Sequence, residues 1–155
     1  MDHNNPSSPD NNRYLEIGRN CACYNLRKAA RAITKFYDDF LRPSGLRTTQ
    51  FSLLMTAKIR GPVTVTKLAG LAVLDRTTLS RNLTILEKSG LIKIEAGEDK
   101  RERQVSLTDK GEEKVIETIP LWEQAQARIT EGMGGERVES FLKDISELVS
   151  LIRSK

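Results

Sequence analysis

The sequence has few of the residues that carry catalysis or bind metals. It contains one histidine, His3, and two cysteines, Cys21 and Cys23. These are too few for a closed zinc site, so we expect no bound metal. The sequence also has no glycine-rich phosphate loop and no serine or cysteine with a partner histidine. We therefore expect neither a cofactor nor enzymatic activity.

Long apolar runs are missing too. No segment approaches the roughly 18 consecutive apolar residues of a membrane span. The N-terminal segment MDHNNPSSPDNN lacks the apolar core of a signal peptide. Because it is rich in Pro, Ser and Asn, we interpret residues 1–12 as a disordered tail. We expect a cytoplasmic protein with no membrane partner, in which both cysteines are free thiols.

Positive charge is concentrated in the middle of the chain. The whole sequence has a formal net charge of +4. Residues 42–103 contain twelve Lys or Arg against six acidic residues, whereas residues 104–155 contain seven against ten. A basic middle segment attracts phosphate, so we expect nucleic-acid binding there and another role for the C-terminal part.

Helical periodicity begins after the tail. A first helix is predicted from about residue 21 to 41, before Pro43, and a second from Thr48 or Thr49, either of which could cap it, to Gly61-Pro62. Residues 63–65 read as a short extended piece, and residues 66–72 as a small helix. The stripe of the first helix consists of Leu26, Ala30, Ile33, Tyr37 and Phe40.

The next helix is the most informative one. Asp75 is a strong N-cap candidate, because its carboxylate can accept from the free amides of the first turn and its charge suits the helix dipole. Gly90 supplies the left-handed residue that ends the helix. Leu79, Leu83 and Leu86 share its buried face. The candidate DNA contacts in this region are Thr66, Arg76, Thr77, Thr78, Ser80, Arg81 and Thr84.

A hairpin follows this helix, with residues 91–94 and 104–107 as strands and residues 96–103 as a wing. Lys100, Arg101 and Arg103 can contact phosphates, and an arginine at a wing tip can enter a narrow minor groove. We expect Asp99 to orient the arginines by ion pairing. A solvated helix face and a charged surface turn are the alternatives, but together the two features favour a winged helix that binds double-stranded DNA.

The C-terminal part reads as a dimerisation element. Thr108 caps a long helix that Pro120 kinks but does not end, and residues 132–135 separate it from a last helix. The apolar stripe of the last helix could pack on its own chain, but its width favours a second subunit and hence a homodimer. That stripe consists of Val138, Phe141, Leu142, Ile145, Leu148, Val149 and Ile152.

Four segments resemble the multiple-antibiotic-resistance regulator (MarR) family of bacterial winged-helix transcription factors. They are DRTTLSRNLTILEKSGLI at 75–92, DKR at 99–101, LTDKG at 107–111 and TQFSLL at 49–54. The resemblance covers nearly everything after the tail. It implies an obligate homodimer that binds a palindromic operator, with one recognition helix per half-site and half-sites about 34–36 Å apart.

The expected fold is mainly α with a small β-hairpin, in the order helix, helix, strand, helix, helix, strand, wing, strand, helix, helix. We assign residues 13–47 to an N-terminal dimerisation helix, 48–107 to a winged helix-turn-helix domain, and 108–155 to C-terminal dimerisation helices. The expected function is a DNA-binding repressor. A winged-helix protein-interaction module without a DNA role is the alternative from another class.

The resemblance implies release from DNA by a small, often aromatic anion bound between the dimer helices and the winged helix. Candidate wall residues are Phe36, Tyr37, Phe40, Arg47 and Phe51, all of which serve equally well as core or surface residues.

Redox control through Cys21 and Cys23 is the alternative mode of regulation. If Asn20 caps the first helix, both thiols lie in its first turn, where free amides and the dipole favour the thiolate. Some members of the family sense organic hydroperoxides through a cysteine near the start of this helix. Residues two apart in a helix cannot bridge each other, however, and free cysteines are often small buried hydrophobes. We therefore favour a structural role for both.

Overall fold

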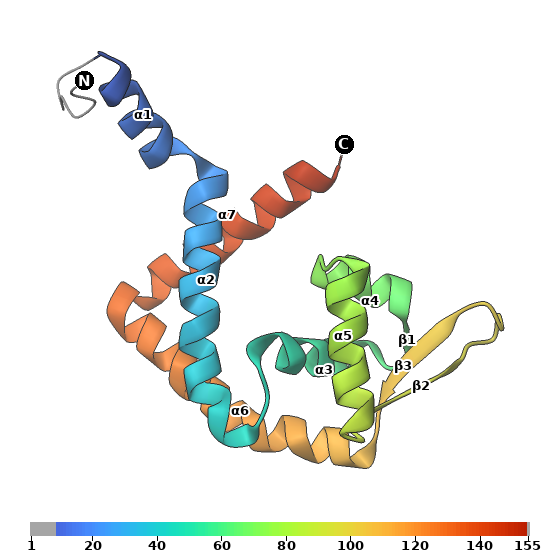
Figure 1. Ribbon diagram of the computed structural model, residues 1–155. Coiled ribbons are helices and arrows are strands. Elements are labelled where there is room, and N and C mark those ends of the chain that lie inside the picture. Colours follow the sequence, from blue (N-terminus) through green and yellow to red (C-terminus); the bar gives the residue numbers. More distant parts are fainter. Residues whose placement is uncertain (1–8, 155) are drawn as a thin grey trace, which may run out of the picture. The chain divides into compact units, whose positions relative to one another are not determined.

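The computed structural model describes residues 9–154 of the chain, which divides into two compact units, residues 1–36 and 37–155. The fold class agrees with the prediction: helices predominate, and a small sheet carries the wing (Figure 1). In chain order the elements are α1 (Pro9–Asn20), α2 (Ala22–Leu41), the 3-10 turn η1 (Arg42–Ser44), α3 (Thr48–Arg60), β1 (Val63–Thr64), α4 (Val65–Ala72), α5 (Arg76–Lys88), β2 (Ile92–Ala96), β3 (Arg103–Leu107), α6 (Asp109–Met133) and α7 (Gly135–Arg153).

The N-terminal unit contains a helix that the sequence analysis missed. Residues 9–12 form the first turn of α1, so the prediction of a disordered tail is wrong for them, and residues 1–8 lie outside the described part. The helix begins at a proline, which favours the first position of a helix. At the junction of α1 and α2, the Asn25 amide donates to the carbonyls of Arg19 and Cys21, each at 3.0 Å.

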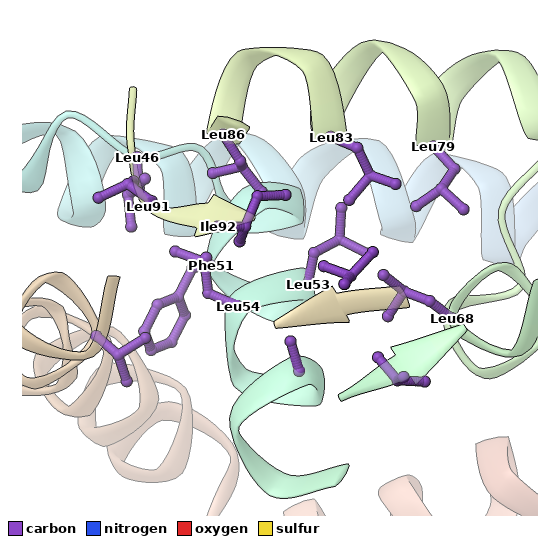
Figure 2. Packing of buried hydrophobic residues seen from close by; sticks show 14 of the residues in the cluster. Leu46, Phe51, Leu53, Leu54, Leu68, Leu79, Leu83, Leu86, Leu91 and Ile92 are labelled. Carbon is purple, nitrogen blue, oxygen red and sulfur yellow. The ribbon is translucent and has the colours of Figure 1, made fainter. Parts of the chain in front are cut away.

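The core of the second unit joins α3, α4, α5 and the sheet (Figure 2). Leu79, Leu83 and Leu86 point from α5 into this core, as their spacing predicts. They meet Leu54 and Leu68, which are fully buried. Each buried leucine stabilises the fold by about 1.5–3 kcal/mol relative to an exposed one, so the apolar face of α5 holds the helix firmly in place.

The sheet has the strand order β1-β3-β2, with both pairings antiparallel. Val105 of β3 lies opposite Val63 on one side and Ile94 on the other. The register of β2 and β3 runs out to Ala96 and Arg103. These two residues therefore belong to the strands, and the turn of the wing is shorter than predicted, covering residues 97–102. The hairpin extends beyond α5 (Figure 1).

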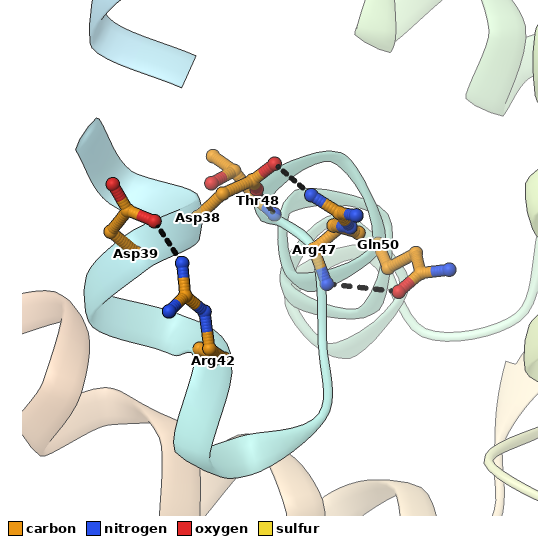
Figure 3. A network of polar contacts seen from close by, with 6 residues as sticks. All are labelled: Asp38, Asp39, Arg42, Arg47, Thr48 and Gln50. Atoms are coloured by element: carbon orange, nitrogen blue, oxygen red, sulfur yellow. Dashed lines mark hydrogen bonds and ion pairs between the residues drawn. The ribbon is translucent and has the colours of Figure 1, made fainter. Parts of the chain in front are cut away.

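The start of α3 differs from its prediction, because the side chain of neither Thr48 nor Thr49 caps it. The Gln50 side chain accepts from the Arg47 amide at 2.9 Å, and Asp38 at the end of α2 accepts from the Thr48 amide at 2.7 Å (Figure 3). Arg47 also donates to Asp38, at 3.0 Å. Burial by itself raises the pKa of Asp38, but the hydrogen bonds from Thr48 and Arg47 outweigh it, and the net pKa is lowered.

The long helix α6 runs through Pro120 without ending, as predicted. The break after it is shorter than the predicted residues 132–135, because α6 continues to Met133 and α7 begins at Gly135, which leaves Gly134 alone between them. Thr108 caps α6 by accepting from the Gly111 amide at 3.0 Å. In the middle of α6, Gln126 accepts from the Tyr37 hydroxyl of α2 at 2.6 Å, and burial raises the pKa of Tyr37. Within residues 9–154, no helix has the length and apolar character that a membrane crossing requires.

Candidate nucleic-acid interface

The helix α5 is capped by Asp75, as the sequence predicts. One carboxylate oxygen accepts from the Thr78 amide at 2.9 Å and the other from the Thr78 hydroxyl at 2.6 Å. The hydrogen bond from the Thr78 side chain is the main reason that the pKa of Asp75 is lowered. At the other end, Gly90 adopts a φ of 72° and its amide donates to Glu87. The sequence thus defines both ends of α5 locally.

A groove of about 560 Å³ lies between α4, α5 and the wing. The side chains of Leu79, Leu83 and Ile94 give it an apolar floor. Its polar lining brings together residues that are distant in the sequence. The predicted DNA contacts among them are Thr66, Arg76, Ser80, Thr84, Arg101 and Arg103.

The other four predicted contacts lie outside this groove. Thr77 and Arg81 are exposed on α5, and Lys100 is exposed at the tip of the wing. Thr78 is half-buried and its hydroxyl donates to Asp75, so it serves the cap. The Thr84 hydroxyl also donates within α5, to the Ser80 carbonyl at 2.9 Å. Its oxygen can still accept, which suits a base amino group better than a phosphate.

The cations of this surface are uncompensated. Within the described residues, none of the five predicted basic contacts forms an ion pair, whereas Arg42, Arg47 and Lys58 each pair with a carboxylate elsewhere in the same unit. A basic side chain without an internal partner can neutralise a phosphate without first breaking an ion pair. The five uncompensated residues are Arg76, Arg81, Lys100, Arg101 and Arg103.

Three polar residues of the groove were not among the predicted DNA contacts: Thr64, Glu87 and Glu102. Helical spacing could have identified Glu87, because it lies seven residues after Ser80 and hence on the same face of α5. Thr64 was predicted only as part of a short extended piece, and it does lie in β1. In the structure it caps α4 by accepting from the Lys67 amide at 3.1 Å.

The role of Asp99 differs in its chemistry from the prediction. Its carboxylate accepts from the backbone amide of Arg101 at 2.9 Å, in place of an ion pair with a guanidinium. The Glu102 amide donates to the Asp99 carbonyl at 2.9 Å, and the Gly97 amide donates to the Glu102 carbonyl at the same distance. Asp99 thereby shapes the turn that presents Arg101.

Four of the five predicted wall residues lie in the second unit, in two kinds of surroundings. Tyr37, Phe40 and Phe51 pack into its core, whereas Arg47 lines a separate polar cavity of about 360 Å³ with Asp38 and Arg42. Phe36 is half-buried at the end of the first unit. A ligand between these residues stays a prediction.

The two cysteines lie at the start of α2, but Asn20 does not cap that helix. Asn20 is the last residue of α1, and Cys21 precedes α2 as its cap. The Cys21 sulfur accepts from the Tyr24 amide at 3.4 Å, in the position that a capping oxygen usually takes. Cys21 is half-buried and Cys23 is exposed, and both are free thiols. No cluster of metal-ligating side chains occurs in the part of the chain that the structure describes.

Comparisons with known proteins agree with this geometry. A sequence model of the MarR family matches residues 46–102, from the residues before α3 to the wing. The transcriptional regulator MosR of M. tuberculosis, whose structure is known in complex with DNA, is 38% identical to this chain. The two structures have a TM-score of 0.74, and the match covers 86% of this chain and 98% of that chain.

Two curated relatives are also transcriptional regulators of the helix-turn-helix type. YwoH of Bacillus subtilis is 33% identical over 94 residues, which are 61% of this chain and 69% of YwoH. SarZ of Staphylococcus epidermidis is 28% identical over 131 residues, which are 83% of this chain and 86% of SarZ. The chain therefore belongs to the MarR family, and it is a DNA-binding winged-helix transcriptional regulator and not an enzyme.

Proposed function

We propose that the protein is a dimeric repressor that places α5 in the major groove of a palindromic operator and the wing against the adjacent minor groove and backbone. The observation that carries the proposal is the groove itself, which is lined by Arg76 and Ser80 of α5 together with Arg101 of the wing and Arg103 of β3. The major groove, about 12 Å wide, admits one α-helix. A wing beside that helix reaches the neighbouring phosphates.

Within this arrangement, the residues on the two sides of the groove have different tasks. Arg81 is exposed on α5 and is the candidate for reading a guanine edge with two hydrogen bonds. Lys100 and Arg101 at the wing tip neutralise phosphates or enter the minor groove, which contributes affinity more than sequence preference.

Dimerisation is supported by the apolar side chains that α7 leaves exposed. Leu142, Leu151 and Ile152 are each more than half exposed. A helix with such a face needs an apolar partner, and a second copy supplies one while setting two recognition helices at a fixed separation. We further propose that this dimer acts in the cytoplasm, where bacterial DNA lies.

A mobility-shift experiment with duplex DNA from upstream of the protein's own gene tests the proposal. Wild type should bind that duplex more tightly than a shuffled duplex, and Arg81→Ala should lower this preference by about tenfold, the discrimination of one bidentate base contact. Arg137→Ala removes an exposed cation from α7 and serves as the matched control with unchanged preference. Failure of wild type to bind any duplex would favour the protein-interaction module.

A thiol-responsive regulator is the second candidate, and the position of Cys21 favours it. Its sulfur accepts from the Tyr24 amide in the first turn of α2, and its side chain is only half-buried. A hydroperoxide that reaches this cysteine oxidises it to a sulfenic acid and is itself reduced to an alcohol. Mild peroxide should weaken operator binding by wild type. Cys21→Ser should abolish this response, and an unchanged response in both Cys21→Ser and Cys23→Ser would exclude these thiols as the sensor.

A further inference from the structure

The C-terminal end of α5 is held by the first turn of α6. Three consecutive carbonyls at this end accept hydrogen bonds from that turn: Ser89 from the Lys110 ammonium at 2.8 Å, Gly90 from the Thr108 hydroxyl at 2.6 Å, and Leu91 from the Thr108 amide at 3.1 Å. The carbonyls in the last turn of α5 accept from the amides of Ser89, Gly90 and Leu91. The bonds from α6 therefore hold the segment that directly follows α5 and ends it.

Close backbone approach at Gly111 makes this contact specific. A Cβ added to Gly111 would lie 2.0 Å from the Leu91 carbonyl oxygen, so no other residue fits without moving α6 away from the segment that follows α5. The Thr108 hydroxyl joins both sides, because it donates to Gly90 and accepts from the Gly111 amide. We refer to Thr108, Lys110 and Gly111 as the α6 clamp.

The same turn also contacts the first helix of the helix-turn-helix. Glu112 accepts from Lys58 of α3 at 2.6 Å, and both side chains are about half exposed. The start of α6 thus touches both helices that flank α4.

We propose that the α6 clamp sets the position of the recognition helix for sequence reading, with Lys110 as a positioning residue that does not itself contact DNA. A displacement of the start of α6 then moves α5 directly, since no flexible linker separates the two. This inference rests on the proposed role of α5 as the recognition helix.

A direct phosphate contact is the alternative role for Lys110. The two roles differ in how loss of the side chain changes the sequence preference and the salt dependence of DNA binding. Loss of a phosphate contact weakens binding to all sequences alike, and in a dimer it lowers the slope of log affinity against log salt concentration by about 2, one contact being lost in each copy. Loss of a positioning contact weakens operator binding more than binding to random duplex and leaves the salt slope unchanged.

The test measures the affinity of full-length Lys110→Met for the operator and for a shuffled duplex over a range of salt concentrations. We expect about three- to tenfold weaker operator binding, the size of one charge-assisted hydrogen bond at a partly solvated site, with the shuffled duplex bound as before. Lys110→Arg should restore the preference. Lys114→Met removes the same charge one turn further along α6 and should bind both duplexes like wild type.

Hydrogen exchange without DNA separates failure of this inference from failure of the proposed function. In Lys110→Met, but not in Lys114→Met, the amides of Ser89, Gly90 and Leu91 should exchange several-fold faster. Unchanged exchange together with an unchanged operator preference would overturn the clamp even if wild type binds DNA. A uniform loss of affinity with a lower salt slope would also overturn it, in favour of a phosphate contact.

Discussion

Val73, between α4 and α5, has a backbone conformation that its side chain disfavours. Its φ is 51°, in the left-handed region, and it is the one residue other than glycine with a positive φ in the described part of the chain. The amide of Val73 donates to the Ala69 carbonyl and thereby ends α4. A β-branched residue in this conformation costs about 1–2 kcal/mol, whereas asparagine tolerates it.

We therefore expect Val73→Asn to raise the free energy of unfolding by about 1 kcal/mol, because relief of strain outweighs the little packing that Val73 makes at 62% exposure. Thermal unfolding of wild type and Val73→Asn measures this change in stability. Ile59→Asn, in an exposed position of α3, is the control and should bring no gain. A lower melting temperature for Val73→Asn would contradict the strain at this turn.

Two glycines of α6 should respond oppositely to alanine. Gly111→Ala places a Cβ against the Leu91 carbonyl and should destabilise the protein by about 3 kcal/mol. Gly132→Ala meets nothing within 4 Å and should stabilise it by about 0.5 kcal/mol through helix propensity. Denaturant unfolding of the two variants checks the contrast, and equal effects would mean that Gly111 does not lie against the Leu91 carbonyl.

At the scale of single residues, contacts between residues close in the sequence could be predicted, whereas contacts between distant residues could not. The caps at Asp75 and Thr108 and the glycine at position 90 could be predicted, because each serves a helix end within a few residues. The carboxylate of Asp38 at the start of α3 could not, because ten residues separate it from Thr48.

At the scale of elements, Asp38 joins α2 to α3, and this connection should depend on pH. Because the folded-state pKa is lowered, the carboxylate stabilises the fold above the unfolded pKa, about 3.9, and this contribution disappears as the pH falls through the folded value. At pH 7, Asp38→Asn should lower the free energy of unfolding by about 1–2 kcal/mol.

Chemical unfolding at several pH values measures the difference in the free energy of unfolding between wild type and Asp38→Asn. It should be largest near neutral pH and shrink below about pH 4. Asp39→Asn, which alters an exposed carboxylate paired with Arg42, is the control and should differ little from wild type at any pH. A difference that stays constant down to pH 2 would refute the role of the Asp38 charge.

The elements themselves could mostly be predicted, since periodicity and caps mark α5, the hairpin and the passage of α6 through Pro120. The exception is α1, whose polar sequence resembles that of a tail by composition. The groove could be predicted only in part. The face of α5 follows from helical spacing, but the presence of Thr64 and Glu102 in the groove depends on how the wing and α4 pack.

At the scale of the whole molecule, the account requires two copies acting on one operator. Each copy contributes one α5 and one wing, and the exposed apolar face of α7 is our candidate for holding them together. Affinity then depends on two sets of phosphate contacts at once. A signal that changes the separation of the two recognition helices lowers affinity without touching the DNA surface.

The salt dependence of operator binding tests this central claim most directly. Each cation that neutralises a phosphate contributes about 0.9 to the slope of log affinity against log salt concentration. With one Arg101 in each of two bound copies, Arg101→Ala should lower the magnitude of the slope by about 2, while operator preference changes little. An unchanged slope would contradict the account, because Arg101 would then lie away from the DNA.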